Sequence, residues 1–145
     1  MIENDVDIDR AVEQVFAYCS DHTNELMWNP AMRYVKKLTE GPIGVGTRYE
    51  MEFVPARPMV GECVSFDPPK TWAVAGRVFG MNVVLGGTVT PTEGGSHLKL
   101  LTEFRAGGPL ALALPLVQRQ MKAALDRDIL NLKAILEKPA VTVGG

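Results

Sequence analysis

Few side chains in this sequence could carry out acid–base, nucleophilic or metal chemistry. The two histidines, His22 and His97, lie far apart, and neither has metal-ligand spacing to a cysteine. Asp21 precedes His22 and could pair with it for acid–base work, although a position near a helix start favours a capping aspartate and a solvent-exposed histidine. No serine stands in a nucleophile-elbow context. The sequence therefore predicts no metal site, no cofactor and no complete catalytic set.

The strand-like segment 47–53 contains the best polar candidate for a buried site. Tyr49, Met51 and Phe53 alternate with three charged residues, so they share one face of the predicted strand. If that face lines an apolar cavity, the Tyr49 hydroxyl needs a hydrogen-bond partner and becomes the first candidate for acid–base catalysis. A slip of one residue in the strand register would instead turn the three side chains outward.

The glycines that precede this segment could be mistaken for a phosphate-binding loop. In a dinucleotide-binding loop the glycines open a helix, and the N-terminus of that helix meets the phosphate. Here Gly41, Gly44 and Gly46 come before a strand. We therefore interpret them as a turn followed by the start of a strand.

Two tryptophans are candidates for the wall of a pocket. Trp28 follows a predicted short helix and precedes a strand, so it either lines a pocket entrance or anchors the helix on the sheet. The anchoring role is favoured, because aromatic side chains dominate the energetics of protein cores. Trp72 has the same two interpretations, more evenly balanced.

The bulk composition narrows the class of protein. A length of 145 residues suits a single domain, and 46% hydrophobic with 22% charged residues is typical of a globular fold. A net charge of −2 does not provide the positive field that a nucleic-acid binder needs. The longest apolar run, 109–117, is far shorter than the ~20 residues of a membrane helix, and the acidic start of the chain does not resemble a signal peptide. We expect a cytoplasmic protein, not inserted in a membrane, with Cys19 as a buried free thiol.

The first part of the chain predicts a strand, two short helices and then a series of strands. Asp9 is expected to cap a helix over 10–18, and a second short helix follows over 23–27. The glycine pair 86–87 predicts a bulge or a bend within its strand. Short strands joined by brief turns indicate an antiparallel meander. The six strand-like segments are 32–38, 47–53, 59–66, 71–79, 82–90 and 97–105.

The end of the chain predicts one long helix. Pro109 follows two glycines and opens it, and Pro115 marks either its true start or a kink. An apolar stripe from Val117 to Leu136 must be buried against one face of the sheet. The space between sheet and helix is then either filled by side chains or used as a pocket. Residues 139–145 are expected to form a flexible tail of this single domain, 1–145.

Five stretches, spread in sequence over nearly the whole chain, resemble the START-like, or SRPBCC, superfamily, and within it the polyketide cyclase/dehydrase and lipid transport branch. Ala11 departs from the proline that members often carry at the start of the first helix. The resemblance implies an α+β helix-grip fold, in which a curved antiparallel sheet of about seven strands wraps around the long C-terminal helix. The stretches that carry it are VDIDRAVEQVFAYCSD, WNPAMRYVKKLTEGPIGVGTRY, FDPPKTWAV, GGSHLKLLTEF and RQMKAALDRDILNLKAILE.

Three hypotheses for the function follow from the resemblance together with the sparse polar residues. The first is binding of a small hydrophobic molecule (a lipid, a quinone or a polyketide-like compound) between the sheet and the C-terminal helix. The second is an aromatase/cyclase-type enzyme, with Tyr49 as acid or base, and the third is a protein-interaction scaffold with a filled cavity. The sequence is also compatible with a homodimer. The expected ligand-contacting residues are Trp28, Tyr49, Met51, Phe53, Trp72, Val83, Leu98, Leu100, Gln118 and Met121.

Overall fold

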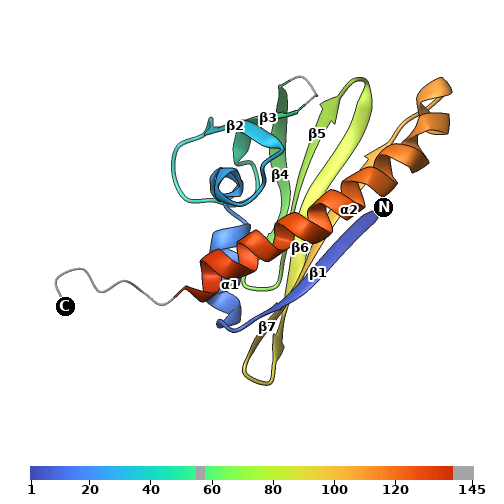
Figure 1. Ribbon diagram of the computed structural model, residues 1–145. Helices are drawn as coiled ribbons and strands as arrows, with labels where there is room; N and C mark the ends of the chain where they lie inside the picture. Colours follow the sequence, from blue (N-terminus) through green and yellow to red (C-terminus); the bar gives the residue numbers. More distant parts are fainter. Residues whose placement is uncertain (55–57, 139–145) are drawn as a thin grey trace.

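The computed structural model describes residues 1–54 and 58–138, and the tail predicted for 139–145 lies outside the described residues. All strands pair antiparallel in one seven-stranded sheet of order β1-β7-β6-β5-β4-β3-β2, and α2 lies across one face of this curled sheet (Figure 1). The predicted α+β helix-grip fold is therefore confirmed. The elements are β1 (Ile2–Ile8), α1 (Val12–Cys19), the 3-10 helix η1 (His22–Met27), β2 (Met32–Lys37), β3 (Arg48–Phe53), β4 (Met59–Asp67), β5 (Thr71–Val78), β6 (Met81–Thr92), β7 (Gly95–Arg105) and α2 (Pro109–Glu137).

The connection between β1 and β2 places two helices over the inner face of the sheet. These strands are consecutive in the chain but form opposite edges of the sheet, so α1 and η1 carry the chain from one edge to the other. α1 packs on β6 and β7, and η1 packs on β2. α2 packs chiefly on β1. The central strands β5 and β6 are therefore covered at one end by α1 and η1 and only loosely by the first half of α2.

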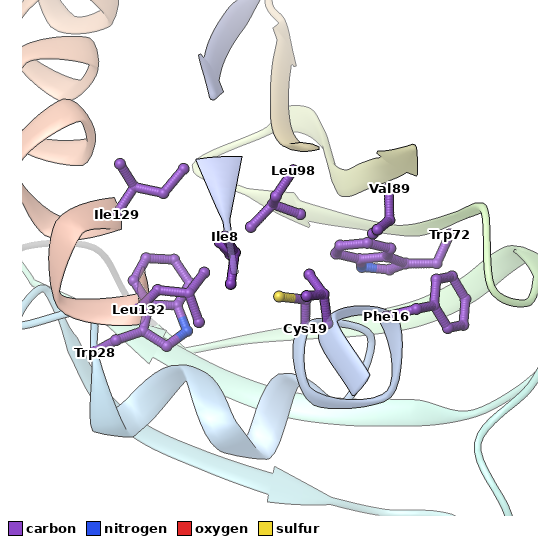
Figure 2. Packing of buried hydrophobic residues seen from close by; sticks show 10 residues of the cluster. Ile8, Phe16, Cys19, Trp28, Trp72, Val89, Leu98, Ile129 and Leu132 are labelled. Atoms are coloured by element: carbon purple, nitrogen blue, oxygen red, sulfur yellow. The ribbon is translucent and has the colours of Figure 1, made fainter. Parts of the chain in front are cut away.

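The core consists of two clusters of buried side chains. The first joins α1, α2 and the inner face of β1, β5, β6 and β7, as Figure 2 shows. It includes Trp28, Trp72 and Leu98, which the sequence places in the core or at a pocket wall. The second cluster lies at the β2–β5 side of the sheet and comprises Met32, Tyr49, Met51, Met59, Cys63 and Val74.

The start of α1 is set by contacts with the far end of the chain. The predicted capping by Asp9 is wrong, because α1 begins at Val12 and Ala11 occupies the N-cap position without a side-chain hydrogen bond. The backbone N–H of Asp9 instead donates to Glu137 Oε2, 2.8 Å away on the last turn of α2. Arg10 also donates to the backbone carbonyl of Glu137. The docking of α2, rather than a local cap, therefore decides where the first helix starts.

The glycine pair in β6 and the proline in α2 differ from what the sequence predicts. The glycine pair Gly86 and Gly87 forms no bulge, because the register of β6 runs unbroken past both neighbours. The two glycines allow close approach instead, since a Cβ on Gly86 would lie 2.3 Å from the carbonyl oxygen of Trp72. Pro115 lies inside α2, which excludes a helix start at that residue.

Candidate functional site

A small cavity of about 50 Å³ lies between the sheet and the three helical segments. Its walls are mostly aromatic and aliphatic, and its polar residues come from η1 and β7. A larger and more open hollow, about 480 Å³, lies between α1, Ile43 and the β4–β5 turn, but its lining includes no group able to form a polar site except Glu13 and Ser20. The smaller cavity is the better candidate because it combines enclosure with polar side chains. Its lining is Cys19, His22, Glu25, Trp28, Trp72, Leu85, Gly86, Leu100, Leu101, Thr102 and Leu125.

Four side chains form a continuous hydrogen-bonded chain at one wall of this cavity. The indole Nε1–H of Trp72 donates to His22 Nε2 at 3.1 Å. His22 Nδ1 lies 3.1 Å from Glu25 Oε1, and the amide of Asn29 donates to Glu25 Oε2 at 2.7 Å. We call Trp72, His22, Glu25 and Asn29 the polar chain. Glu25 lies one 3-10 turn after His22, so the two side chains project from the same side of η1.

The polar chain determines which ring nitrogen of His22 carries the proton. An indole N–H can only donate, so His22 Nε2 must be the accepting, unprotonated nitrogen. The ring proton is therefore on Nδ1, from which it is donated to the carboxylate of Glu25. Both ring nitrogens and both carboxylate oxygens are thus bonded to protein groups. The imidazole of His22 therefore has no free lone pair for a substrate proton.

His22 is buried, with 5% of its surface exposed, so the expectation of a solvent-exposed histidine is wrong. Asp21 does act as the predicted cap, because its carboxylate accepts from the Thr23 backbone N–H at 3.0 Å. The partner of His22 is Glu25 and not Asp21. The spacing of His22 and Glu25 was the one sequence signal for this pair, since positions three apart face each other on a helix.

Tyr49 is fully buried and lies beside the polar chain. The centroids of its ring and the His22 ring are 5.6 Å apart. Among the described residues, its hydroxyl is the one buried side-chain polar atom without a hydrogen-bond partner. Burial, and then the nearby Asp21 carboxylate, raises the pKa of Tyr49, which keeps the phenol protonated. Tyr49 belongs to the second core cluster and not to the cavity lining, so its contact with a ligand stays a prediction.

The chain matches a known protein family. A family model described as polyketide cyclase/dehydrase and lipid transport matches residues 1–137. The chain belongs to this family. The resemblance seen in the sequence is thus confirmed over nearly its whole length. No curated protein sequence matches the chain.

Solved structures share the fold of this member of the polyketide cyclase/dehydrase and lipid transport family. TTHA0849 from Thermus thermophilus is 13% identical with a TM-score of 0.74, over 93% of this chain and 95% of that one. The KanY protein is 20% identical with a TM-score of 0.71, over 94% and 96%. A norcoclaurine synthase from Thalictrum flavum, in complex with a transition-state analogue, is 18% identical with a TM-score of 0.66, over 94% and 95%. At these identities the likeness shows the fold alone.

The predicted contact residues of this family member are distributed over four regions. Trp28, Trp72 and Leu100 line the cavity. Val83 and Leu98 are buried in the sheet outside that lining. Met51 and Phe53 belong to or pack against the second cluster, and Gln118 and Met121 lie half-buried on the first half of α2. The cavity-lining residues that the sequence did not single out for ligand contact are Cys19, His22, Glu25, Leu85, Gly86, Leu101, Thr102 and Leu125.

Cys19 lines the cavity as a buried free thiol, as the sequence predicts. Burial, and secondarily the charge of Glu25, raises the pKa of Cys19 to about 12. A thiol in this state is a poor nucleophile at neutral pH, because the thiolate is the reactive form. Cys19 therefore contributes an apolar wall to the cavity.

No helix in residues 1–54 and 58–138 is both long enough and apolar enough to cross a membrane. In the same residues, no three side chains of the histidine, cysteine, aspartate and glutamate types come close enough to hold a metal ion.

Asp128 on α2 gives a pH-dependent prediction. Its side chain is 9% exposed and lies 3.9 Å from Arg127 Nε. Burial raises the pKa of Asp128, against a smaller opposite effect of Arg127. The folded state therefore holds this proton more tightly than the unfolded chain, so stability is lost as the pH rises through the raised pKa. We expect Asp128→Asn to increase the free energy of unfolding at about pH 7 and to lose this advantage below the ordinary aspartate range.

Urea unfolding at both pH values measures this difference. Glu93→Gln is the matched control, because it removes one negative charge from an exposed position at the β6–β7 turn. It should leave the stability nearly unchanged at both pH values. An Asp128→Asn protein that is less stable than the parent at neutral pH would contradict the prediction.

Proposed function

We propose that this protein binds a small, largely apolar molecule between the sheet and α2, at the cavity that the polar chain borders. The observation that carries the proposal is the lining: two tryptophans and several leucines surround a few polar groups. Such a wall excludes water from an apolar ligand, and the few polar groups orient the ligand by binding a polar group at one of its ends. Membership of a family described by lipid transport supports the same class of ligand.

Ligand binding requires the cavity to widen. Its present volume of about 50 Å³ is well below the roughly 300–1,000 Å³ of pockets that hold drug-sized molecules. The first half of α2 is the natural moving part, because Gln118 and Met121 are only half-buried and α2 packs chiefly on β1. Displacement of this half would join the cavity to the inner faces of β5 and β6. Val83 would then become accessible to the ligand.

The hydrogen bonds of His22 favour binding over acid–base catalysis. Both ring nitrogens of His22 are bonded to protein groups, and the phenol of Tyr49 stays protonated. A base that removes a proton from a substrate needs a free lone pair within hydrogen-bond reach. The norcoclaurine synthase structure holds a transition-state analogue, which supports occupancy of this fold by a small molecule without assigning its reaction to the present chain.

Filling the cavity is expected to weaken binding of an apolar probe. Leu125 lines the cavity from α2, so Leu125→Trp places a larger ring in the space that a ligand would use. We expect the affinity for a fluorescent naphthalene sulfonate probe to fall at least about tenfold, since the probe must displace that ring. Fluorescence titration measures the affinity, and native mass spectrometry with solvent extraction identifies any molecule that co-purifies with the parent protein.

Leu130→Trp provides the matched control, because Leu130 is on the same helix and is 55% exposed. It adds the same ring outside the cavity and should leave the probe affinity unchanged. Equal affinities of the parent and Leu125→Trp proteins would place the probe elsewhere and would count against the proposed site.

A further inference from the structure

One end of the molecule combines the β5–β6 hairpin tip with the start of α2. The register pairs Asn82 at the start of β6 with Arg105 at the end of β7, so the tip and the end of β7 lie at the same end of the sheet. α2 begins shortly afterwards, at Pro109. Figure 1 shows the hairpin and the first turns of α2 projecting at this end, away from α1.

The first turns of α2 expose large apolar side chains. Leu112 is 86% exposed, Leu116 is 62% exposed, and Val117, which the sequence places on the buried stripe, is 44% exposed. Residues 109–118, PLALALPLVQ, contain no charged side chain. A helix that is apolar on all sides is normally covered on all sides. Here the sheet can cover only one side, so the other side lacks a partner among the residues that the structure describes.

Phe79 adds an aromatic side chain to the same end at a conformational cost. It forms the hairpin tip with Gly80, and both residues have positive φ, 52° and 75°. This left-handed conformation suits glycine or asparagine and is unfavourable for a bulky residue. Phe79 is also 54% exposed, so packing does not compensate for the strain. A strained and exposed aromatic residue points to a role outside the folded domain.

The charged side chains at this end of the molecule are predominantly basic. Arg77, Arg105 and Arg119 are exposed on β5, β7 and α2. The sequence has no acidic residue between Asp67 and Glu93, nor between Glu103 and Asp126. Glu103 itself pairs with Arg105 at 3.1 Å. This end is therefore basic in a chain whose net charge is −2.

We propose that this surface docks on an anionic lipid surface. The docking surface consists of Phe79, Leu112, Leu116 and Val117, with Arg77, Arg105 and Arg119 at the same end of the molecule. The apolar side chains would enter the boundary between headgroups and acyl chains, and the arginines would contact lipid phosphates. A second copy of the chain fits less well, because a two-fold dimer through this surface would bring its arginines against their own copies. The inference concerns a surface separate from the cavity and does not depend on the proposed ligand.

Vesicle binding tests the proposal with the full chain. The probes are vesicles of pure phosphatidylcholine and vesicles of phosphatidylcholine and phosphatidylglycerol in equal parts. We expect co-sedimentation with the second kind, weakened by salt, and at least about tenfold less partitioning for Leu112→Glu with Leu116→Glu. Replacing Arg105 or Arg119 by glutamine should reduce partitioning by about fivefold each.

Two variants separate docking from folding. Leu130→Glu makes the same change at an exposed position farther along α2 and should bind vesicles like the parent. Phe79→Asn suits the left-handed backbone, so it should preserve or raise thermal stability while it weakens vesicle binding. Absence of binding to the anionic vesicles would overturn the proposal. So would a dimer in light scattering that the Leu112→Glu, Leu116→Glu protein no longer forms, because this would make the surface a contact between copies.

Discussion

Replacing Trp72 with alanine is expected to lower the free energy of unfolding by about 3–5 kcal/mol, the largest effect that we predict for one side chain. Trp72 is 2% exposed, and its ring meets the edge of the Phe16 ring at a centroid distance of 5.6 Å. The substitution removes this packing and also the donor to His22. Urea unfolding followed by circular dichroism measures the loss. Because the removed ring borders the cavity, the alanine protein should also accept bulkier apolar probes.

Trp72→Phe separates packing from hydrogen bonding. It keeps most of the aromatic contact but leaves His22 Nε2 without its donor in a buried site, so a loss of about 1–3 kcal/mol is expected. Nitrogen NMR of the parent protein should show a neutral His22 with its proton on Nδ1. A Trp72→Phe protein as stable as the parent would mean that the indole N–H contributes nothing. An alanine protein that loses less than about 1 kcal/mol would contradict the packing argument.

Gly86→Ala is expected to destabilise the protein by about 3 kcal/mol without removing any existing contact. The new Cβ would lie 2.3 Å from the Trp72 carbonyl oxygen and 3.0 Å from the Cα of Ala73. Both are backbone atoms of β5, so no side-chain rotation relieves the overlap, and the two central strands must separate locally. Urea unfolding gives the change in stability. Amide exchange should report faster opening at the β5–β6 pairing.

Gly44→Ala is the control for glycine replacement. No atom lies within 4 Å of a Cβ built at Gly44. The backbone N–H that donates to the Thr47 hydroxyl at 3.0 Å is kept. The stability should therefore change by about 0.5 kcal/mol or less. Similar losses in the Gly86→Ala and Gly44→Ala proteins would show that chain entropy, and not the close approach of β5 and β6, accounts for the effect.

Local patterns in the sequence determined the elements and their order. The alternation of Tyr49, Met51 and Phe53 predicted a strand with an inward face, and Tyr49 and Met51 are fully buried. The apolar spacing along α2 predicted its buried side, and Leu132 is fully buried. Short strands with brief turns predicted the antiparallel meander. These features depend on residues close in the chain, whose periodicity is visible without a fold.

The tertiary structure alone decided the polar chain and the exposed end of α2. His22 is buried and bonded to the indole of Trp72 on β5, 50 positions away in the chain, and nothing local to either residue signals that bond. Gly86 is required by the neighbouring strand, whereas its sequence context predicted a bulge or a bend. Val117 continues the apolar stripe but is exposed because the sheet covers only part of α2. Contacts between distant residues depend on how the elements pack, and the periodicity of one segment carries no information about that packing.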